Sequence, residues 1–274
     1  MIHEKQVYIS IVNYNNANQT INCIKSVLKL NYDNYKIVLI DNNSSDNSIE
    51  CLENWLAEQS ISFSYKIPFS NNNIVTIIKS NFNGGYAFGN NIAIKHIFEC
   101  NPLSYIWVLN NDTMVENNSL KSLTDCFNSS SLQILGCKIM SSDTNVVESF
   151  GGRINKIFLS AYNCQKHDAN INYIPGTSFF FNKAVIDEIG FLPEEYFMYY
   201  EDVDWCTRAI KNGISLLIDE NAIVKHYNNN KLTFSLKLIS FKNRYLYCYN
   251  HYPAYLFIQI LLTPLYIIKK LVFK

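Results

Sequence analysis

The stretch VYISIVNYNN, residues 7–16, decides the fold class of this chain. Its first six residues are a short apolar run rich in Ile and Val, and a cluster of asparagines ends it. Residues 20–30 then carry apolar side chains at helical spacing, and residues 37–40 are a second apolar run that ends in DNNSSD, residues 41–46. A strand, a helix and a second strand in this order predict a parallel β-α-β unit.

The same alternation continues along the chain. Helices are predicted over residues 48–57 and from NGG at 83–85 to about 98, and strands over 74–79 and 105–109. From about residue 133 the pattern changes to short strand-like runs, at residues 134–139, 146–150, 153–159 and 173–181. We therefore predict an α/β fold for residues 1–230, with a mixed, Rossmann-like sheet flanked by helices.

Polar clusters follow three of the predicted strands, at residues 13–16, 41–46 and 110–112. In open α/β sheets, ligands bind beyond the carboxyl ends of the strands, so we expect a binding site there. Asp41 is expected to accept hydrogen bonds from the base or ribose of a nucleotide, although DNNSSD also fits a turn that leads into a helix.

A glycine-rich segment, NGGYAFGNN at residues 83–91, opens one of the predicted helices. Glycines at a helix entry let a phosphate or a sugar approach the backbone closely. The segment has neither the Gly-Lys-Ser/Thr of a P-loop nor the G-x-G-x-x-G spacing of dinucleotide-binding proteins. Nucleoside triphosphate hydrolysis and hydride transfer are therefore disfavoured.

The sequence NND at residues 110–112 offers one carboxylate and neutral amides. Mg²⁺ is commonly held by one or two protein ligands together with a substrate diphosphate, so this segment is a candidate metal site. His226 follows the apolar residues 222–224 and is a second candidate ligand, with a purely structural histidine as the alternative.

The segment YFMYYEDVDWC, residues 196–206, places three carboxylates directly after five large side chains. Carboxylates in such apolar surroundings are usually paired, bound to a metal or used for proton transfer. The alternative is that an aspartate caps a helix, because residues 203–211 have helical spacing and Asn-Gly follows them.

The formal net charge is zero, but the charges are unevenly distributed. Residues 221–274 contain eight Lys and Arg and no Asp or Glu, whereas the first 220 residues contain 15 basic and 23 acidic side chains. A basic end on an acidic body indicates an anionic partner, such as a phospholipid surface or a phosphate-bearing substrate.

The end of the chain, residues 231–274, is expected to be a helical extension. Residues 231–249 predict an amphipathic helix with Lys237, Lys242 and Arg244 on or near its polar face. Residues 254–273 are largely apolar, but Pro264 and the flanking lysines favour an interfacial helix over a membrane span. We expect peripheral contact with an anionic membrane, with docking on the core as the alternative.

Cysteine usage and the N-terminus suggest a compartment. The eight cysteines form no C-x-x-C pair, which is typical of reduced thiols and does not predict a zinc site. The N-terminus leads straight into a strand pattern without the layout of a signal peptide. We therefore expect a cytoplasmic protein, peripheral on the inner face of the cell membrane.

Seven motifs occur along the chain: SIVNYNN (10–16), IDNNSSD (40–46), NFNGGYAFGNN (81–91), VLNND (108–112), GTSFFF (176–181), FMYYEDVDW (197–205) and VKH (224–226). Their order and spacing resemble those of family 2 glycosyltransferases, and the nearest branch looks like the rhamnosyltransferase-like enzymes of bacterial surface polysaccharide assembly. Each motif alone is weak, but seven in order are specific. The resemblance covers residues 5–250.

The resemblance implies a GT-A fold, a divalent metal (Mg²⁺ or Mn²⁺) and inversion at the anomeric carbon. It assigns Asp202 as the catalytic base, with Glu201 and Asp204 as organisers of the site. The implied metal or diphosphate ligands are Asp112 and His226, although Asn110 stands where the family's D-x-D motif has its first carboxylate. The implied residues for nucleotide and donor are Asn13, Asn15, Asp41, Asn83, Gly84, Gly85, Asn90, Asn110 and Asn111, and those on the acceptor side are Gly176, Thr177, Tyr199, Tyr200, Asp204 and Trp205.

A single displacement needs a base for the acceptor hydroxyl and positive charge on the leaving diphosphate. The implied donor is a nucleotide-diphosphate sugar (dTDP-rhamnose or a UDP-sugar), and the implied acceptor is a glycan or a polyprenyl-diphosphate-linked sugar. No nucleic-acid partner is expected, and a homodimer is left open.

Two other function classes remain open. A nucleotidyltransferase would need a glycine-rich phosphate loop with Lys or Arg near the N-terminus, and residues 13–19 contain no basic side chain. A non-catalytic module that binds nucleotide sugars or glycans would not need Asp202.

Overall fold

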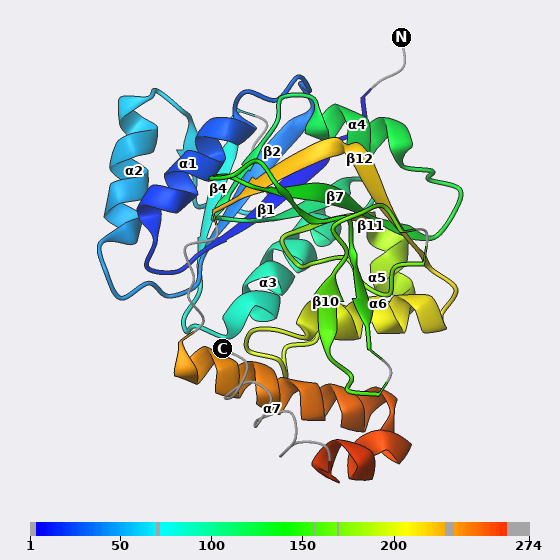
Figure 1. Ribbon diagram of the computed structural model, residues 1–274. Helices are drawn as coiled ribbons and strands as arrows, with labels where there is room; N and C mark the ends of the chain where they lie inside the picture. Colours follow the sequence, from blue (N-terminus) through cyan, green and yellow to red (C-terminus); the bar gives the residue numbers. More distant parts are fainter. Residues whose placement is uncertain (1–3, 70–71, 156, 169, 228–232, 262–274) are drawn as a thin grey trace.

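Strands form the centre of the molecule. The computed structural model describes residues 4–69, 72–155, 157–168, 170–227 and 233–261. The strands in these ranges are β1 (Val7–Asn13), β2 (Tyr35–Asp41), β3 (Phe63–Ser64), β4 (Val75–Lys79), β5 (Tyr105–Asn110), β6 (Thr113–Val115), β7 (Gln133–Ser141), β8 (Val147–Ser149), β9 (Gly152–Ile154), β10 (Ala161–Asn163), β11 (Ser178–Asn182) and β12 (Ser215–His226). Ten of them form one sheet in the order β3-β4-β2-β1-β5-β11-β7-β12-β6, with β8 beside β7, while β9 and β10 form a separate pair (Figure 1).

Helices cover both faces of this sheet (Figure 1). They are α1 (Ala17–Val27), α2 (Ser48–Glu58), α3 (Gly85–Cys100), α4 (Ser119–Cys126), α5 (Lys183–Ile189), α6 (Glu201–Lys211) and α7 (Phe234–His251), followed by a short 3-10 helix at Pro253–Tyr255. Buried side chains of α1, α2 and α4 share one hydrophobic cluster, and those of α3, α5, α6 and α7 share another. The predicted α/β fold with a mixed sheet and flanking helices is confirmed.

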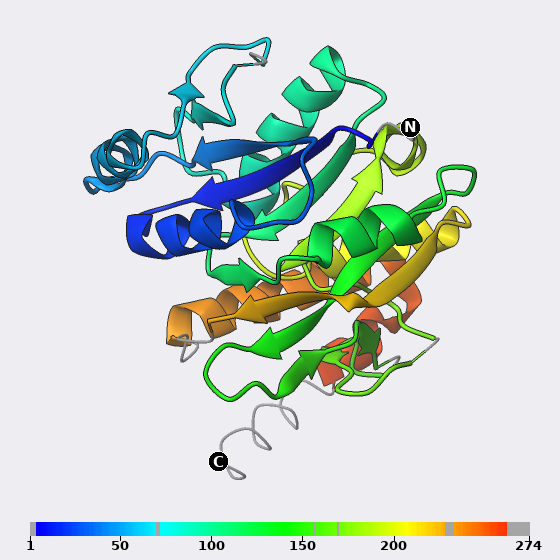
Figure 2. The same cartoon turned by 90° about the horizontal axis from the view of Figure 1, so that it is seen from above.

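The parallel half of the sheet brings the predicted polar clusters to one edge. Strand β1 lies between β2 and β5 and runs parallel to both (Figure 2). Asn13 is in register with Asp41, and Val12 is in register with Asn110. These strands are buried on both faces, which explains their nearly continuous apolar sequences. Their carboxyl ends therefore meet at the edge where a ligand is expected.

Antiparallel pairing enters with β11, as the changed pattern of the second half predicted. Strand β11 is antiparallel to β5 and β7, whereas β12 is parallel to β7. The strand predicted over residues 173–181 is β11, which begins five residues later than predicted. Of the strand predicted over residues 153–159, only the first two residues are extended, as the end of β9. That early end has a local cause, because Asn155 Oδ1 accepts hydrogen bonds from the N–H groups of Ile157 and Phe158 and turns the chain.

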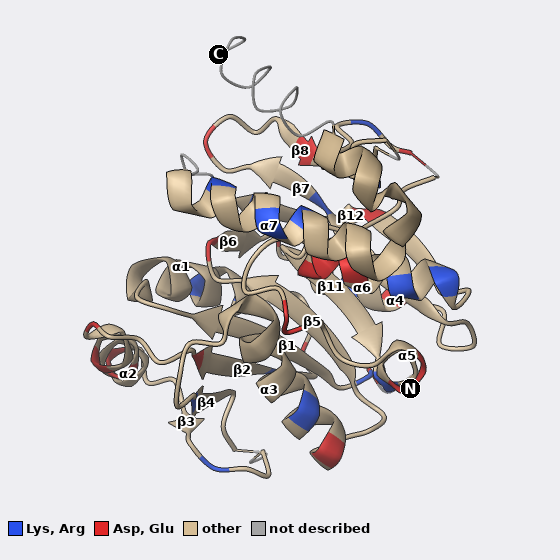
Figure 3. Cartoon of the chain, turned by 90° about the horizontal axis from the view of Figure 1, so that it is seen from below, with Lys and Arg blue, Asp and Glu red and all other residues tan. Residues whose placement is uncertain are grey.

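Helix α7 lies where the sequence predicted an amphipathic helix over residues 231–249, and it packs on α6 (Figure 3). Lys237 and Lys242 are exposed, as predicted. The predicted polar position of Arg244 is wrong, because Arg244 is buried and its guanidinium group lies against the rings of Phe241 and Tyr245. Buried side chains of α7 thus belong to the core, which is the docking that the sequence left as the alternative.

The exposed surface of this extension includes large apolar side chains as well as the two lysines. Exposed large side chains there include Phe234, Leu238, Phe257, Ile260 and Leu261. None of the helices in the described ranges combines the length and the apolarity needed to cross a bilayer. Residues 262–274, with most of the predicted interfacial segment, lie outside the described residues, as does Lys231.

Candidate active site

The first part of the site is a hydrogen-bond network at the ends of β1 and β2. Asn13 donates through Nδ2 to Asp41 Oδ1 at 2.9 Å and to Ser44 Oγ at 3.1 Å. Its Oδ1 accepts from Thr20 Oγ1, which in turn accepts from Asn111 Nδ2. Three of the predicted donor-side residues therefore lie in one network, although the buried carboxylate of Asp41 already accepts bonds from its own loop.

The outer rim of this network is formed by Asn15. Its side chain bonds to the loop after β2, where Asn15 Oδ1 accepts from Ser45 N–H at 2.8 Å and Nδ2 donates to Ser45 Oγ. Asn15 adopts a left-handed backbone conformation with φ of 51°, which asparagine tolerates better than most residues. The asparagine cluster after β1 therefore holds the two loops together at the edge of the sheet.

The glycine-rich segment forms the second part of the site. Asn42 donates to Asn83 Oδ1 and to the carbonyl oxygen of Gly85, both at 2.9 Å, and so joins the end of β2 to the start of α3. Asn90 accepts from Ser10 Oγ and donates to the carbonyl oxygen of Tyr86. The predicted residues of this segment thus lie beside the ends of the parallel strands, with Gly84 as the N-cap residue of α3.

Gly85 connects this segment to the acidic segment. Its φ is +90°, and a Cβ atom there would lie 2.1 Å from the carbonyl oxygen of Phe197. That oxygen accepts a hydrogen bond from Tyr86 N–H at 3.1 Å. Only glycine lets the two chain segments approach this closely, so the requirement for Gly85 is steric.

Tyr86 links three parts of the site. Its hydroxyl donates to the carbonyl oxygen of Gly176, and the N–H of Gly176 donates to Asp202 Oδ2 at 3.0 Å. Burial raises the pKa of Tyr86 well above its ordinary value, and the charges of Glu201, Asp202 and Asp112 add to the rise. Tyr86 therefore joins the predicted base to the 176–177 loop, and the charge of the predicted metal-site carboxylate also acts on its hydroxyl.

Glu201 and Asp202 differ in how their oxygens are bonded. Both oxygens of Asp202 accept from backbone N–H groups, of Gly176 at 3.0 Å and of Val203 at 2.8 Å. Among the described residues, the buried Oε2 of Glu201 has no hydrogen-bond partner. Burial raises the pKa of Asp202, and those N–H groups oppose the rise. Burial and the charge of Asp202 raise the pKa of Glu201 well above its ordinary value.

The helix-cap alternative is wrong for Asp202. Helix α6 begins at Glu201 with Tyr200 as the N-cap residue, so Asp202 lies inside the first turn. Tyr199 and Tyr200 both have a left-handed backbone, with φ of 70° and 74°. Large side chains rarely adopt this conformation, so the chain enters α6 through a strained turn.

The third part of the site lies at the end of β5. Asn110 N–H donates to the carbonyl oxygen of Thr177 at 3.1 Å, which places the 176–177 loop beside this strand end. His226 Nε2 lies 3.4 Å from Asp112 Oδ2, and His226 Nδ1 lies 3.2 Å from Glu148 Oε2. Burial acts to lower the pKa of His226, but hydrogen bonds and charges from these two carboxylates outweigh it and raise the pKa.

These residues fit a divalent cation that the substrate helps to hold. In the described part of the chain, Asn110 Oδ1 and Asp112 Oδ1 are buried oxygens without a hydrogen-bond partner. Oxygen ligands suit Mg²⁺ and Mn²⁺, and an imidazole suits Mn²⁺. The same ranges contain no group of three or more His, Cys, Asp or Glu arranged to enclose a metal, so a bound ion needs ligands from the substrate.

Three residues predicted for the acceptor side do not fit a sugar-binding surface. Trp205 is 0% exposed, donates to the carbonyl oxygen of Gly190 and packs against the rings of Phe179 and Phe181. Asp204 is also 0% exposed. Tyr200 is buried and donates to the carbonyl oxygen of Leu159. Their assignment to an acceptor surface is wrong, because they belong to the core.

The remaining acceptor-side residues are placed at the site. Gly176, Thr177 and Tyr199 are partly exposed. Burial raises the pKa of Tyr199, and the charge of Glu201 adds to the rise.

Three residues with contacts in the site were not predicted. Asn42 lies in the motif IDNNSSD and Tyr86 in NFNGGYAFGNN, each next to a predicted site residue, and a polar side chain within a motif was the available signal. Glu148 comes from the edge strand β8, where nothing in the sequence indicates its contact with His226.

Comparison with known proteins identifies the family. Residues 8–190 match the model of glycosyl transferase family 2, which is more than half of the chain. The chain belongs to this family. The matched range ends before Glu201, so the acidic segment lies outside it. A hexosyltransferase of low-salt glycan biosynthesis from Haloferax volcanii, Agl10, is 24% identical over 187 residues, which are 66% of this chain and 55% of that protein. The chain spans about half the length of the curated relatives it matches.

Solved structures of glycosyltransferases share the fold. The mannosyltransferase PcManGT of Pyrobaculum calidifontis, solved with GDP-Man and Mn²⁺, has a TM-score of 0.62 at 10% identity and covers 91% of this chain and 65% of its own. GalNAc-T7, solved with UDP, GalNAc and Mn²⁺, has a TM-score of 0.66 at 14% identity and covers 84% of this chain and 45% of its own. The family 2 glycosyltransferase therefore has the predicted GT-A fold.

Proposed function

We propose that this glycosyltransferase transfers a sugar from a nucleotide-diphosphate sugar to a glycan or lipid-linked hydroxyl with inversion, and that Asp202 is the base. The supporting observation is the hydrogen-bonded chain from Tyr86 through Gly176 to Asp202. It joins the donor-side helix entry to the carboxylate pair, and the charges of this pair and of Asp112 all act on the Tyr86 hydroxyl. The family match decides against the nucleotidyltransferase alternative.

The carboxylate pair suits a base that works near neutral pH. Burial raises the pKa of both carboxyl groups, and the backbone N–H groups of Gly176 and Val203 favour the charged form of Asp202. Its burial raises its affinity for the proton of an acceptor hydroxyl, while the N–H groups of Gly176 and Val203 fix its orientation. An ionised Asp202 then accepts the acceptor proton as the glycosidic bond forms, and the nucleoside diphosphate leaves from the other face of the sugar.

Mg²⁺ or Mn²⁺ is the cofactor in this proposal. Asp112 and His226 would hold it, together with the diphosphate of the donor. When bound, the ion supplies positive charge next to the charge that develops on the diphosphate. Glu148 orients His226 through its second ring nitrogen, as carboxylates often do for metal-binding histidines. Mn²⁺ in the solved relatives of the same fold supports this assignment.

The donor in this proposal is dTDP-rhamnose or a UDP-sugar. Relatives of the same fold were solved with GDP-Man or with UDP, which supports a nucleotide sugar as the donor. The similarity to a hexosyltransferase of glycan biosynthesis supports transfer of a hexose. The product in this proposal is a surface polysaccharide such as a capsule or O-antigen.

Peripheral membrane contact is a separate part of the proposal. The exposed apolar side chains Phe257, Ile260 and Leu261 project from a basic C-terminal region. Apolar residues with nearby lysines suit the interface of an anionic bilayer on the inner face of the cell membrane, where a polyprenyl-diphosphate-linked acceptor would be found.

Replacing Phe257, Ile260 and Leu261 together by serine tests the membrane contact. Sedimentation with phosphatidylglycerol vesicles should fall, because apolar surface that enters the interface is lost. Leu103→Ser is the matched control, since Leu103 is 85% exposed and lies between α3 and β5. Equal sedimentation of the triple variant and the control would contradict the contact.

Substitution of two carboxylates tests the reaction. With nucleotide sugars and Mn²⁺, Asp202→Asn should lower kcat by about 10²- to 10⁴-fold, because it removes the base. Its affinity for nucleoside diphosphate should stay the same, whereas Asp112→Ala should weaken binding of nucleoside diphosphate with Mn²⁺. Full turnover by Asp202→Asn would refute the assignment of the base, and unchanged binding by Asp112→Ala would refute the metal site.

A further inference from the structure

Helix α7 reaches the catalytic segment through one buried amide. Asn243 lies on the core-facing side of α7 and is 3% exposed. Its Nδ2 donates to the carbonyl oxygen of Met198 at 2.8 Å and to that of Tyr199 at 2.9 Å. Both N–H bonds of one amide group are thus directed at consecutive peptide units of the loop that precedes α6.

These two peptide units are part of the strained turn into α6. Met198 O precedes Tyr199, and Tyr199 O precedes Tyr200, the two residues with a left-handed backbone. Large residues keep this conformation only where their surroundings fix it, and strained backbone of this kind is concentrated at functional sites. Asn243 fixes the carbonyl groups on both sides of Tyr199.

The opposite side of the same loop is held by α3. Tyr86 N–H donates to the carbonyl oxygen of Phe197, where Gly85 allows the close approach. The loop is therefore fixed at three consecutive carbonyl groups, those of Phe197, Met198 and Tyr199, by two helices. The next residues after this turn are Glu201 and Asp202. A change in the turn changes where α6 starts and hence the direction of both carboxylates.

We propose that Asn243 is a positioning residue for the reaction, which holds the Tyr199–Tyr200 turn so that Asp202 is oriented toward the acceptor hydroxyl. This inference rests on the proposed function. It assigns the C-terminal helix a part in catalysis that is independent of membrane contact. A purely structural role would limit Asn243 to docking α7 on the core.

Tyr247→Phe is the matched control for Asn243→Ala. Tyr247 also lies buried on α7, and its hydroxyl forms a hydrogen bond with Thr207 at 2.9 Å, but it bonds to no carbonyl of the turn in the described contacts. Both substitutions remove polar contacts between α7 and the core, and both should lower Tm. Asn243→Asp adds a second test, because a carboxylate of the same shape donates no hydrogen bond to either carbonyl oxygen.

The expected result is a selective loss of turnover by Asn243→Ala. Its kcat should fall by about 10- to 100-fold at a temperature far below Tm, because misplaced catalytic groups lose rate without loss of binding. KM for the donor should stay within about twofold of that of the parent protein. Tyr247→Phe should keep its kcat, and Asn243→Asp should be no better than Asn243→Ala. Equal kcat values for Asn243→Ala and Tyr247→Phe would overturn the proposal.

Hydrogen exchange of the backbone N–H groups of residues 197–203 gives a readout that needs no turnover. Exchange there should be faster in Asn243→Ala than in Tyr247→Phe, because the turn loses its restraint. Equal exchange in the two variants would also overturn the proposal. If exchange differs but the parent protein transfers no sugar, the positioning of the turn is supported and the proposed function fails.

Discussion

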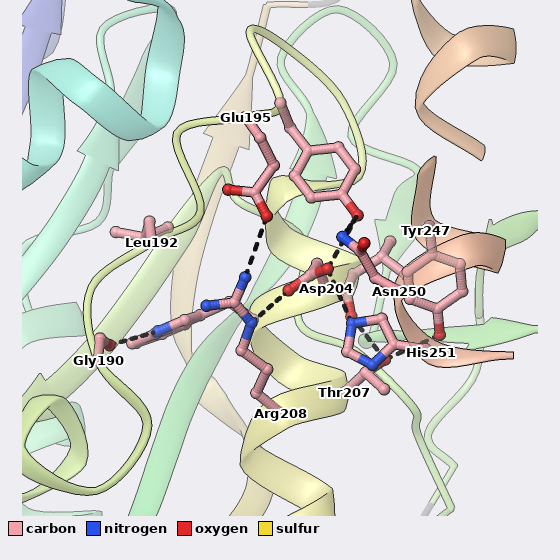
Figure 4. Close-up of polar contacts among 12 residues, drawn as sticks. Gly190, Leu192, Glu195, Asp204, Thr207, Arg208, Tyr247, Asn250 and His251 are labelled. Atoms are coloured by element: carbon pink, nitrogen blue, oxygen red, sulfur yellow. Dashed lines mark hydrogen bonds and ion pairs between the residues drawn. The ribbon is translucent and has the colours of Figure 1, made fainter. Parts of the chain in front are cut away.

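Helix α6 carries two kinds of carboxylate within its first turn. Both oxygens of Asp204 have partners (Figure 4): Arg208 Nε lies 2.6 Å from Oδ1, and Oδ2 is 2.8 Å from His251 Nε2 and 2.9 Å from the Tyr196 hydroxyl. Glu201 and Asp202, two or three residues earlier, have neither Arg nor His as an ion-pair partner in the described contacts. The same helix thus begins with two carboxylates that have no cationic partner in the described contacts, and continues with Asp204, which is paired with Arg208 and His251.

The pKa shifts follow this difference. Burial acts to raise the pKa of Asp204, but the hydrogen bond from His251 and the charge of Arg208 outweigh it and lower the pKa. Burial raises the pKa of Glu201 and of Asp202, and no cation reverses that direction. A carboxylate with a lowered pKa serves structure, because it keeps its charge and its partners. A carboxylate with a raised pKa is suited to proton transfer and destabilises the fold when it ionises.

Asp204→Asn should cause the largest change in stability. It would leave Arg208 and His251 beside a neutral amide, and breaking a buried ion pair costs about 3 to 5 kcal/mol. Urea unfolding of Asp204→Asn should show this loss in the free energy of unfolding. In Asp187→Asn, which removes an exposed pair with Lys183, the change should be below about 1 kcal/mol. If Asp204→Asn kept its stability but lost turnover, Asp204 would serve the reaction and not the fold, which would contradict this assignment.

Glu201→Gln should change stability in the opposite direction. The folded-state pKa of Glu201 is raised above the ordinary 4.5, so its contribution is fully present below that value and is lost as the pH rises toward the folded-state pKa. In this window the folded protein holds a proton that the unfolded chain releases, and stability falls by about 1 kcal/mol for each pH unit. Glutamine does not titrate, so the free energy of unfolding of the variant should increase relative to that of the parent protein as the pH rises.

Tm measured from about pH 5 to pH 8 checks this expectation, since the window lies above the ordinary pKa of a carboxyl group. Glu188→Gln is the control, because it makes the same replacement at an exposed position on α5. Parallel curves for Glu201→Gln and Glu188→Gln would show that Glu201 ionises in the folded state as readily as an exposed glutamate.

The sequence predicted the elements that local pattern determines. Strands β1 and β2 and their polar ends follow from apolar runs closed by asparagine and aspartate clusters, and sheet register then brings Asn13 to Asp41. The role of an aromatic residue was less predictable. Trp205 belongs to the core and Tyr199 to the site, yet both stand in the same aromatic segment. Hydrophobicity alone does not distinguish the wall of a pocket from a core.

Contacts between distant segments were the other limit. Nothing about a glutamate in an edge strand indicates that Glu148 meets His226, 78 residues later. The left-handed turn at Tyr199 and Tyr200 has no glycine or asparagine to mark it, because tertiary contacts impose it. Asn243 occupies an ordinary helix position, and only the packing of α7 on the core directs its amide at that turn.

Tyr196→Phe should cause the smallest change in stability, and it tests a single hydrogen bond to Asp204. The hydroxyl of Tyr196 donates to Asp204 Oδ2 and accepts from Asn250 Nδ2 at 3.2 Å, while its ring is fully buried and remains in the variant. Since Arg208 and His251 still hold the carboxylate, the free energy of unfolding should fall by only about 1 kcal/mol.

The acid side of the stability curve shows whether that hydroxyl acts through Asp204. The lowered pKa of Asp204 gives stability that is present above the ordinary value of 3.8 and is lost as the pH falls through the folded-state value. Without the Tyr196 hydroxyl this pKa should rise, so Tyr196→Phe should lose its stability at a higher pH than the parent protein. An equal loss at every pH would mean that the hydroxyl stabilises the fold only through Asn250. In that case Arg208 and His251 alone would account for the lowered pKa of Asp204, in contrast to the raised pKa values of Glu201 and Asp202.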